Sequence, residues 1–430
     1  MQELPSPSRA RLHQLLALVS LALIGTLPFW LSDLDLHMAA HFYHPGAEDP
    51  WPESSRSFWV FLYQAAPLIG GLILIGSLLA IAATRIWHSQ RRRRRYAVFV
   101  LAVTLLGPGL VINGVIKDYW GRPRPHQTLD LGGTQPYALP LVRTHEGKGM
   151  SFPSGHAAMG FALGAFYFVW RRRRPRLARA ALLVSVVLGA LIGVGRMTAG
   201  DHFLSDVIWS AVLTYGVAFL LYWFVLRIPQ WEDARALRPP PPPRPLRHPG
   251  LTAGAYLLAA AVLLFAVLLT TPVQETRNLG VQALAPASGP RTLRLVADAG
   301  TLSLFRLGTT GPAGEAVSIR LKGRGFGLPS SRVRGRLERT ADTLTYRVTH
   351  TGIFTEQDST LTVGIDPTAW DLVTMATGSG DIRVLALGQP APRLELTAAK
   401  GLVLDENRAP PDTALKAPTM SPTGPAGAAR

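Results

Sequence analysis

The sequence predicts an α-helical integral membrane protein with a C-terminal all-β domain. Apolar stretches of roughly 17–25 residues, long enough to cross a bilayer, recur over the first 272 positions. From about residue 291 the pattern changes to a period-two alternation of apolar and polar residues, which is typical of strands. The composition also agrees with a membrane protein, since 48% of the 430 residues are hydrophobic although the formal net charge is +17. The chain has no cysteine, which excludes disulfides, thiolate metal sites and cysteine nucleophiles.

Seven membrane spans are expected from the apolar stretches. Trp30, Trp59 and Trp87 fall at the ends of stretches, where an amphipathic ring prefers the membrane interface. A cleaved signal peptide is a weaker interpretation of the first stretch, because no small-residue cleavage site follows it. The spans are placed near 12–31, 58–86, 96–116, 156–170, 180–197, 204–226 and 252–272.

Arginine clusters occupy every second loop between these spans. Loops rich in arginine face the cytoplasm, so the intervening loops and everything after the seventh span are expected on the outer side. Nucleic acid is not expected as a partner, because long uncharged apolar stretches separate the clusters. The clusters are Arg9 and Arg11, Arg91 to Arg95, Arg171 to Arg174, and Arg235, Arg238, Arg244 and Arg247.

Three polar segments adjoin the predicted outer boundary. The first segment is Lys117–Pro125, the second is Ser151–His156 and the third is Gly195–Asp206. Ionisable groups at the membrane are costly, and they indicate function by default.

The cations of these segments suit a phosphate group. Lys117, Arg124 and Arg196 supply three positive charges able to surround a phosphate dianion, the arginines through planar forks. Ser154 and Gly155 lie where a loop becomes a helix, so backbone N–H groups and the helix dipole favour an anion there.

Two histidines complete the pattern. His202 and Asp206 are four residues apart and share a helix face, so the carboxylate is expected to orient the ring for nucleophilic attack. His156, from another helix, is a candidate general acid. Each residue alone has a structural explanation, such as an Arg196–Asp206 ion pair between helices, but such explanations account poorly for the ordered set.

The ordered set resembles the signature of the type 2 phosphatidic acid phosphatase (PAP2) superfamily. The signature is lysine, six residues and Arg-Pro; Pro-Ser-Gly-His; then arginine, five residues, histidine, three residues and aspartate. One departure is Gly195, where the family usually has serine. Arg122 belongs to the Gly-Arg-Pro-Arg-Pro form of many bacterial members, and its role stays open.

The resemblance implies a six-helix core, with the seventh span outside it, and no required metal or other cofactor. It implies a phosphohistidine on His202, Asp206 orienting that residue and His156 as general acid. The phosphate ligands that it implies are Lys117, Arg124, Ser154, Gly155 and Arg196.

The function implied is that of a lipid phosphate phosphatase in a bacterial cytoplasmic (inner) membrane. Its partners would be the bilayer and a phosphorylated lipid, a monoester or a diphosphate, bound at the periplasmic face. Lipid A, undecaprenyl diphosphate, phosphatidylglycerophosphate and phosphatidate are all candidates, although a Gly-Gly insert before the second segment resembles the lipid A phosphatase branch. The loop 125–153 is expected to cover the site, and its candidate headgroup-binding residues are His126, Asp130, Arg143, His145, Glu146 and Lys148.

Three alternatives stay open. The same residues would serve phosphate transfer between lipids, because access of the acceptor decides the outcome. A non-catalytic envelope anchor that works through the β domain belongs to another functional class. Haloperoxidase chemistry, which the superfamily also includes, is the least favoured because the core is buried in lipid.

The C-terminal region is expected to form many short strands between glycine-rich turns. Its Gly-Ser-Gly-Asp-Ile-Arg-Val stretch resembles β-solenoid, adhesin-like domains, with a sandwich as the alternative, and contacts with envelope components are the expected role. The expected strands contain Leu293/Leu295, Leu302/Leu304, Val317/Ile319/Leu321, Leu344/Tyr346/Val348, Leu361/Val363/Ile365, Ile382/Val384 and Leu394/Leu396.

These patterns divide the chain into five parts. They are a phosphatase core (1–230), a cytoplasmic Pro/Arg-rich linker (231–250), a seventh helix (251–273), a periplasmic β domain (274–406) and a disordered tail (407–430).

Overall fold

The computed structural model of the protein contains two compact units. The first comprises Met1–Gln274 with the segments Arg324–Arg332 and Thr351–Gln357; the second comprises Glu275–Gly323, Val333–His350 and Asp358–Arg430. The polyproline part of the expected linker and the expected disordered tail lie outside the described residues. The structure describes residues 7–45, 47, 49–86, 93–133, 135–144, 149–236, 249–269, 271–283, 290–307, 316–340, 342–352 and 356–406.

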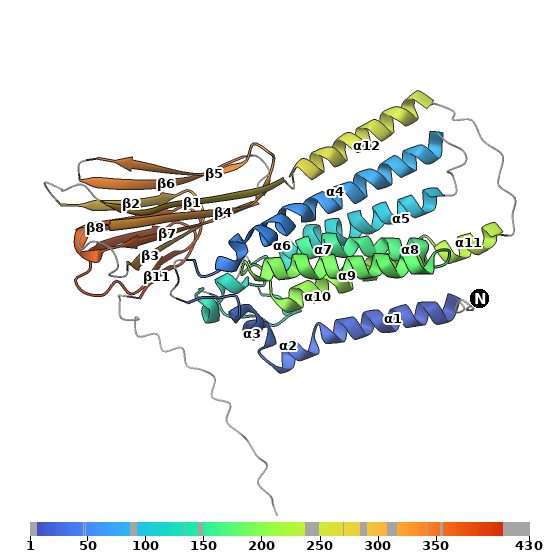
Figure 1. Cartoon of the computed structure of the whole chain (residues 1–430), viewed down its shortest axis with the longest axis horizontal. Helices are drawn as coiled ribbons and strands as arrows, with labels where there is room; N and C mark the ends of the chain where they lie inside the picture. Colours follow the sequence, from blue (N-terminus) through green and yellow to red (C-terminus); the bar gives the residue numbers. More distant parts are fainter. Residues whose placement is uncertain are drawn as a thin grey trace, which may run out of the picture. The chain divides into compact units, whose positions relative to one another are not determined.

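The first unit is helical, and its long helices run side by side (Figure 1). The α-helices are α1 (Pro7–Ile24), α2 (Leu27–Leu31), α3 (Leu34–Ala40), α4 (Ser57–Ile86), α5 (Arg94–Thr104), α6 (Lys117–Trp120), α7 (Gly155–Phe161), α8 (Ala165–Trp170), α9 (Pro175–Met197), α10 (Leu204–Leu220), α11 (Ile228–Ala236) and α12 (Pro249–Leu269). A π-helix, η3 (Leu105–Ile116), joins α5 to α6, and a second, η7 (Leu221–Val225), extends α10.

Five helical stretches within the described residues are long and apolar enough to cross a membrane. They correspond to expected spans one, two, three, five and six. The expected fourth span is divided between α7 and α8 by a 3-10 turn, and the apolar stretch within α12 is shorter, so spans four and seven stay predictions. The five stretches are Ser8–Leu31, Ser57–Thr84, Arg94–Ile116, Pro175–Met197 and Leu204–Val225.

The divided helix α7–α8 is short but packs closely against its neighbours. A Cβ atom at Gly160 would lie 2.7 Å from the Cα atom of Gly189 in α9, and one at Gly164 would lie 2.4 Å from the ring of Tyr215 in α10. Small residues let helices approach closely in a membrane, where lipid provides no hydrophobic drive for association. The tight packing holds the first turn of α7, which carries His156, inside the unit.

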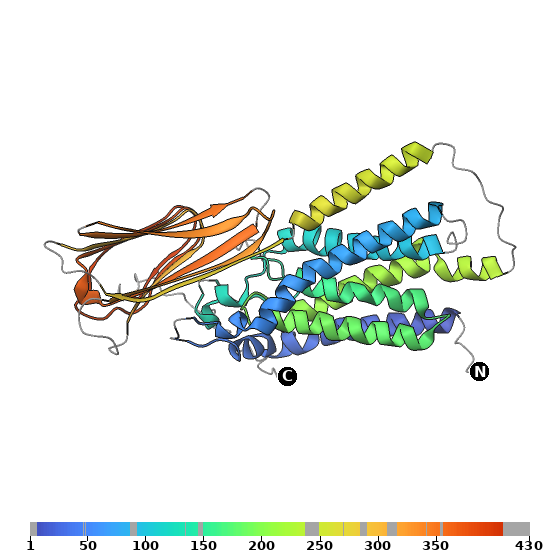
Figure 2. The ribbon, with the colours of Figure 1, turned by 45° about the horizontal axis from the view of Figure 1, so that its top comes forward.

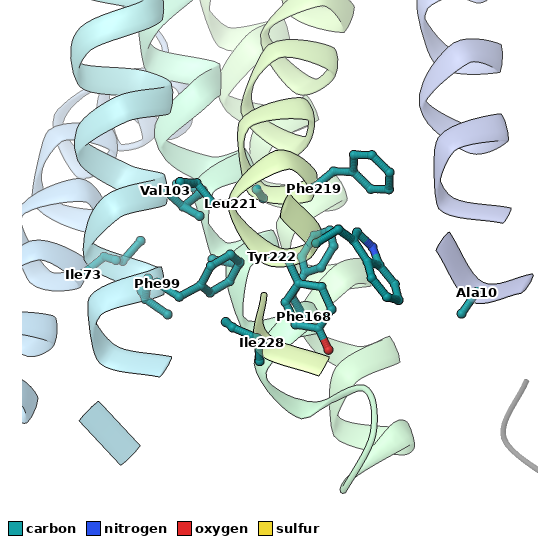
Figure 3. Close-up of a cluster of buried hydrophobic side chains, with 14 residues drawn as sticks. Ala10, Ile73, Phe99, Val103, Phe168, Phe219, Leu221, Tyr222 and Ile228 are labelled. Carbon is teal, nitrogen blue, oxygen red and sulfur yellow. The ribbon is translucent and has the colours of Figure 1, made fainter. Parts of the chain in front are cut away.

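Helices of the first unit share an aromatic cluster (Figure 3). Phe99 of α5 makes edge-to-face contacts with Phe168 of α8 and Tyr222 of η7, with ring centroids 6.0 and 5.9 Å apart. Each such pair contributes about 1 kcal/mol beyond the burial of its area. On outward faces, Leu72, Leu183 and similar side chains are exposed, as suits helices that contact lipid.

The strands form two sheets, which appear as two layers in Figure 2. One sheet has the order β1-β4-β7-β3-β9-β11 and the other β10-β8-β2-β6-β5. The strands are β1 (Thr271–Ala283), β2 (Thr292–Ala297), β3 (Thr301–Arg306), β4 (Ala316–Gly327), β5 (Arg332–Arg339), β6 (Thr343–Thr351), β7 (Glu356–Ile365), β8 (Leu372–Thr377), β9 (Ile382–Val384), β10 (Arg393–Ala398) and β11 (Val403–Asp405).

From β7 to β11 consecutive strands alternate between the two sheets, whereas β3 and β4 share one sheet and β5 and β6 share the other. Strand β2 pairs with β6 and β8, while β3 pairs with β7 and β9, all in parallel. These parallel pairs have the arrangement of a solenoid, in which each turn adds one strand to each sheet, and they differ from the pairs of an antiparallel sandwich. Glycine is required where the turns stack: Gly380 has φ +125°, and a Cβ atom there would lie 2.3 Å from the carbonyl oxygen of Gly300.

Candidate active site

Backbone hydrogen bonds join the three polar segments. The N–H of Ser151 in the second segment donates to the carbonyl of Arg122 in the first, at 3.1 Å. The N–H of Ser154 donates to the carbonyl of Asp206 in the third, at 3.4 Å. The segments are far apart in sequence, yet the fold holds them together as one site.

Two of the predicted phosphate ligands converge on one carboxylate, that of Asp201. Nη2 of Arg196 lies 2.8 Å from Oδ2 of Asp201, and Nη1 of Arg124 lies 3.5 Å from Oδ1. Burial alone would raise the pKa of Asp201, but the charges of Arg196, Arg124 and Arg324 hold it well below its usual range. The Nε atom of Arg196 has no hydrogen-bond partner among the described residues. The arginines therefore already gather around an anionic group.

His156 lies in the first turn of α7 and is buried. Lys117, Arg196 and His202 interact electrostatically with the ring of His156. Its ring stacks on Tyr63 of α4, with centroids 5.0 Å apart and planes at 16°. The guanidinium of Arg196 also lies over the Tyr63 ring, 4.5 Å from its centroid. One aromatic ring thus contacts both a candidate acid and a candidate phosphate ligand.

Ser154 and Gly155 form the start of α7, as expected. Within the described residues the Oγ atom of Ser154 has no hydrogen-bond partner, although it is buried. A Cβ atom at position 155 would lie 2.2 Å from Oδ1 of Asn113, whose Nδ2 donates to the carbonyl of Pro108 at 2.7 Å. A larger residue at position 155 would therefore have to displace the Asn113 side chain and its hydrogen bond, so glycine suits this close approach of η3.

His202 is held by a backbone carbonyl. Its Nδ1 lies 2.6 Å from the carbonyl oxygen of Ser151, whereas Oδ2 of Asp206 is 3.9 Å away. Because a carbonyl only accepts, Nδ1 carries the proton and Nε2 keeps its lone pair. Burial lowers the pKa of His202 below its ordinary value of 6.5, and Arg196 and Arg124 act in the same direction, although Asp206 opposes the shift.

Asp206 lies close to His202, as expected from their spacing, and it also contacts Ser151, whose carbonyl holds the ring. Oδ2 of Asp206 accepts from the hydroxyl of Ser151 at 2.6 Å and from the N–H of Phe203 at 2.8 Å. The hydroxyl of Ser151 and its carbonyl therefore link the carboxylate to the ring.

Arg122, whose role the sequence left open, is completely buried behind the site. It pairs with Asp206 and, at 2.8 Å, with Asp35 of α3. Nη1 also donates to the hydroxyl of Ser205 at 2.8 Å, and the guanidinium lies 4.7 Å from the Phe203 ring centroid. Arg122 is the partner of Asp206, and Arg196 pairs with Asp201, so the alternative Arg196–Asp206 pair does not form.

Comparison with known proteins identifies the family. The PAP2 superfamily matches residues 96–230. Lipid A 4'-phosphatase of Francisella tularensis subsp. novicida (strain U112) is 33% identical over 220 residues, which cover 51% of this chain and 98% of that protein. The chain belongs to the PAP2 superfamily.

Two further relatives agree with this PAP2 assignment. Lipid A 4'-phosphatase of Rhizobium leguminosarum is 36% identical over 160 residues, covering 36% of this chain and 66% of that protein. Phosphatidylglycerophosphatase B of Bacillus subtilis (strain 168) is 29% identical over 140 residues, covering 31% of this chain and 61% of that protein. This PAP2 protein is a multi-pass bacterial membrane enzyme that hydrolyses phosphoric monoesters.

The PAP2 site contains residues that the sequence interpretation missed. Asp35 lies in the loop between the first two expected spans, and Tyr63 lies in the second span, so both are outside the signature. Their contacts with Arg122 and His156 arise from the tertiary fold. Ser151 and Asp201 lie within quoted segments, and their signal was their position beside signature residues. No group of three or more His, Asp or Glu side chains that could hold a metal occurs in the part of the chain that the structure describes.

The expected covering loop contributes unevenly to the PAP2 site. Nδ1 of His126 lies 2.8 Å from the carbonyl oxygen of Gly200, beside the arginine cluster. Asp130 and Arg143 are exposed to solvent. His145, Glu146 and Lys148 lie outside the described residues.

Proposed function

We propose that this PAP2 enzyme removes phosphate from a membrane lipid at the periplasmic face of the bacterial inner membrane, through a phosphohistidine on His202. The observation that carries the proposal is the hydrogen bond from Nδ1 of His202 to the carbonyl of Ser151, at 2.6 Å. It leaves Nε2 as a nucleophile beside a cluster of guanidinium groups. Cations around a phosphoryl group stabilise the charge of the transition state.

In the first step, Nε2 of His202 attacks phosphorus and forms a P–N bond while the bond from phosphorus to the ester oxygen breaks. His156 gives its proton to the departing alkoxide, which leaves as a lipid alcohol. Lys117, Arg124 and Arg196 hold the phosphoryl oxygens, with Ser154 and the Gly155 amide. Asp206, whose Oδ2 lies 3.9 Å from Nδ1, stabilises the positive charge that His202 acquires.

In the second step, water attacks the phosphohistidine. His156, now neutral, takes a proton from this water as the P–O bond forms and the P–N bond breaks. Inorganic phosphate leaves, and both histidines return to their starting protonation states. No metal or redox step is needed for this balance.

The substrate is proposed to be a phosphomonoester of the lipid A type. Two of the relatives described above are lipid A 4'-phosphatases, and one of these is covered over 98% of its length. Phosphatidylglycerophosphate is the second candidate, supported by the Bacillus subtilis relative. The exposed apolar faces of the helices support a lipid substrate, because its tail can lie in the bilayer beside them.

The periplasmic location is supported by where the helices begin and end. Gly155 begins α7, Arg196 lies in the last turn of α9 and His202 precedes α10, so these residues share one end of the helices. The arginines between α8 and α9 lie at the opposite end. Since arginine-rich loops face the cytoplasm, the site is proposed to face the periplasm.

A panel of lipid phosphates and diphosphates tests the substrate. Purified protein in vesicles is incubated with lipid A, phosphatidylglycerophosphate, phosphatidate and undecaprenyl diphosphate, and phosphate release is ranked. Lipid A is expected to be the best substrate; an inactive protein on all four lipids would contradict the proposal.

Two measurements distinguish the alternatives. With a labelled lipid donor, free phosphate indicates hydrolysis and a second labelled lipid indicates phosphotransfer. A non-catalytic anchor would show no difference between the wild type and His202→Ala. The proposal predicts that this variant loses phosphate release, whereas the control His37→Ala, at an exposed position, keeps it.

A further inference from the structure

A buried carboxylate occupies the centre of the arginine cluster. Asp201 is 4% exposed and immediately precedes the proposed nucleophile, His202. Its Oδ2 lies 2.8 Å from Nη2 of Arg196 and 3.5 Å from Nη1 of Arg324, which belongs to the segment Arg324–Arg332 of the first unit. Its Oδ1 lies 3.5 Å from Nη1 of Arg124 and 3.8 Å from Nδ1 of His126.

We propose that Asp201 competes with phosphate for Arg124 and Arg196, and thereby sets the affinity of the site for its substrate and for the phosphate product. The inference rests on the proposed function, because it takes these two arginines as phosphate ligands. Asp201 is a residue of this chain that the superfamily signature quoted above leaves unspecified, since it falls among the five residues between the arginine and the histidine.

The geometry explains how one carboxylate can compete with a phosphate. Carboxylate and phosphate oxygens bind the same guanidinium N–H groups. Nη2 of Arg196 already forms an ion pair with Asp201, while Nε has no hydrogen-bond partner among the described residues. A phosphate that binds to Arg196 must therefore share the guanidinium with Asp201 or displace it.

Arg324 holds the carboxylate from another direction. Its Nη2 hydrogen-bonds the hydroxyl of Ser54, and Nη1 donates to the carbonyl of Ala199 at 3.4 Å. These contacts fix the guanidinium near Asp201 independently of Arg124 and Arg196. When those two arginines turn to the phosphate, Arg324 and His126 keep Asp201 paired, so the exchange does not leave a buried charge alone.

The consequence is a site that releases its product. A cluster of arginines without a counter-anion would bind inorganic phosphate tightly. The reason is that charge-assisted hydrogen bonds between guanidinium and phosphate groups are strong in a site shielded from water. The negative charge of Asp201 lies beside the position of the phosphate and repels it. The pKa of Asp201 is held well below its usual range, so the charge persists over the working pH range.

The test is product inhibition in Asp201→Asn, which keeps the shape and removes the charge. In this variant we expect the inhibition constant for inorganic phosphate to fall roughly tenfold or more. The KM for the lipid substrate should fall in the same way, and kcat should not rise. A damaged site would instead raise both constants. Asp33→Asn, an exposed position without a side-chain cap bond, is the control with unchanged constants. An unchanged or higher inhibition constant in Asp201→Asn would overturn the proposal.

A second variant tests the same idea with Asp201 in place. Arg324→Gln frees Asp201 to hold Arg124 and Arg196 more strongly, so the inhibition constant for phosphate is expected to rise severalfold. In the double variant with Asp201→Asn this rise should disappear, because coupled residues are not additive. An equal rise in both backgrounds, or no rise in Arg324→Gln, would contradict the proposal.

The outcomes are separable from those of the proposed function. Phosphate binding to the purified wild type and variants is also measured by titration calorimetry, which needs no turnover. If the wild type releases no phosphate from any lipid, the proposed function fails. If the wild type is active but Asp201→Asn binds phosphate no more tightly, the inference fails alone.

Discussion

Nδ1 of His202 lies 2.6 Å from the carbonyl oxygen of Ser151, and the hydroxyl of the same serine lies 2.6 Å from Oδ2 of Asp206. One residue therefore orients the proposed nucleophile with its backbone and positions the carboxylate with its side chain. The ring is neutral with the proton on Nδ1, which is the form required for attack on phosphorus.

The first prediction concerns pH. A protonated His202 cannot attack, so kcat/KM is lost as the pH falls through the pKa of this residue. Burial lowers that pKa below its ordinary value of 6.5, so the acidic limb is expected below pH 6.5. The measurement is kcat/KM against pH with a soluble phosphomonoester.

The substrate also titrates in this range, and Asp206→Asn separates the two effects. Asp206 raises the pKa of His202, so removal of its charge should move the acidic limb to lower pH in whatever activity is left. A limb that stays in place would belong to the substrate and would count against the assignment.

The second prediction is that Ser151→Ala lowers kcat with little change in KM. The variant keeps the carbonyl that holds His202 but removes the hydroxyl that bonds Asp206. Loss of a hydrogen bond to a charged group costs about 1.5–3 kcal/mol, which corresponds to a roughly tenfold to hundredfold loss of rate. Steady-state kinetics of the variant check this. A rise in KM with kcat intact would show that Ser151 acts on substrate binding instead.

Much of this site was predictable from the sequence, because the signature residues lie at fixed spacings beside spans that all end at one boundary. Lys117, Arg124, His156 and Arg196 were expected near one another. In the structure, Lys117 and Arg196 interact electrostatically with His156, and Arg124 and Arg196 both pair with Asp201. The link through Ser151 was not predictable, since four-residue spacing on a helix indicates only that His202 and Asp206 lie close to each other. The two residues do lie close, although His202 precedes α10 and is not part of it.

Residues from outside the signature were hidden for a different reason. Tyr63 lies in an apolar span, where an aromatic residue carries no sign of its stacking on His156. In the β region, the alternation predicted β2, β3, β4, β6, β7, β9 and β10, and it missed β1, β5, β8 and β11. In β5, Arg332–Arg339 is mostly exposed and buries few apolar side chains, so the strand lacks the alternation on which the prediction depends. The alternation is present in β8, which buries Val373 and Met375, and the prediction overlooked it.

The third prediction concerns stability. Arg122 is buried and faces two buried carboxylates, so Arg122→Met would leave Asp35 and Asp206 without their cation. Removing one partner of a buried charge network costs about 3–5 kcal/mol. Thermal unfolding in detergent should show a large fall in Tm, while Arg179→Met, at an exposed position, should not. An unchanged Tm in Arg122→Met would show that the network does not stabilise the fold.

The fourth prediction tests the close approach at the start of α7. Gly155→Ala should reduce activity at least about tenfold, because the new methyl group meets Oδ1 of Asn113 and shifts the phosphate ligands. Asn113→Ala in the same chain should restore part of the activity. Gly216→Ala is the matched control, since a Cβ atom there would meet nothing within 4 Å. Failure of the second substitution to restore activity would point to a cause other than this clash.

The most direct test of the central claim is to trap the covalent intermediate. Enzyme mixed with a lipid labelled in its phosphate is quenched within the first turnover, and the protein is digested and sequenced. The account predicts label on His202 that is stable in alkali and labile in acid, and no label in His202→Ala. Label on another residue, or phosphate release by His202→Ala at the wild-type rate, would contradict it.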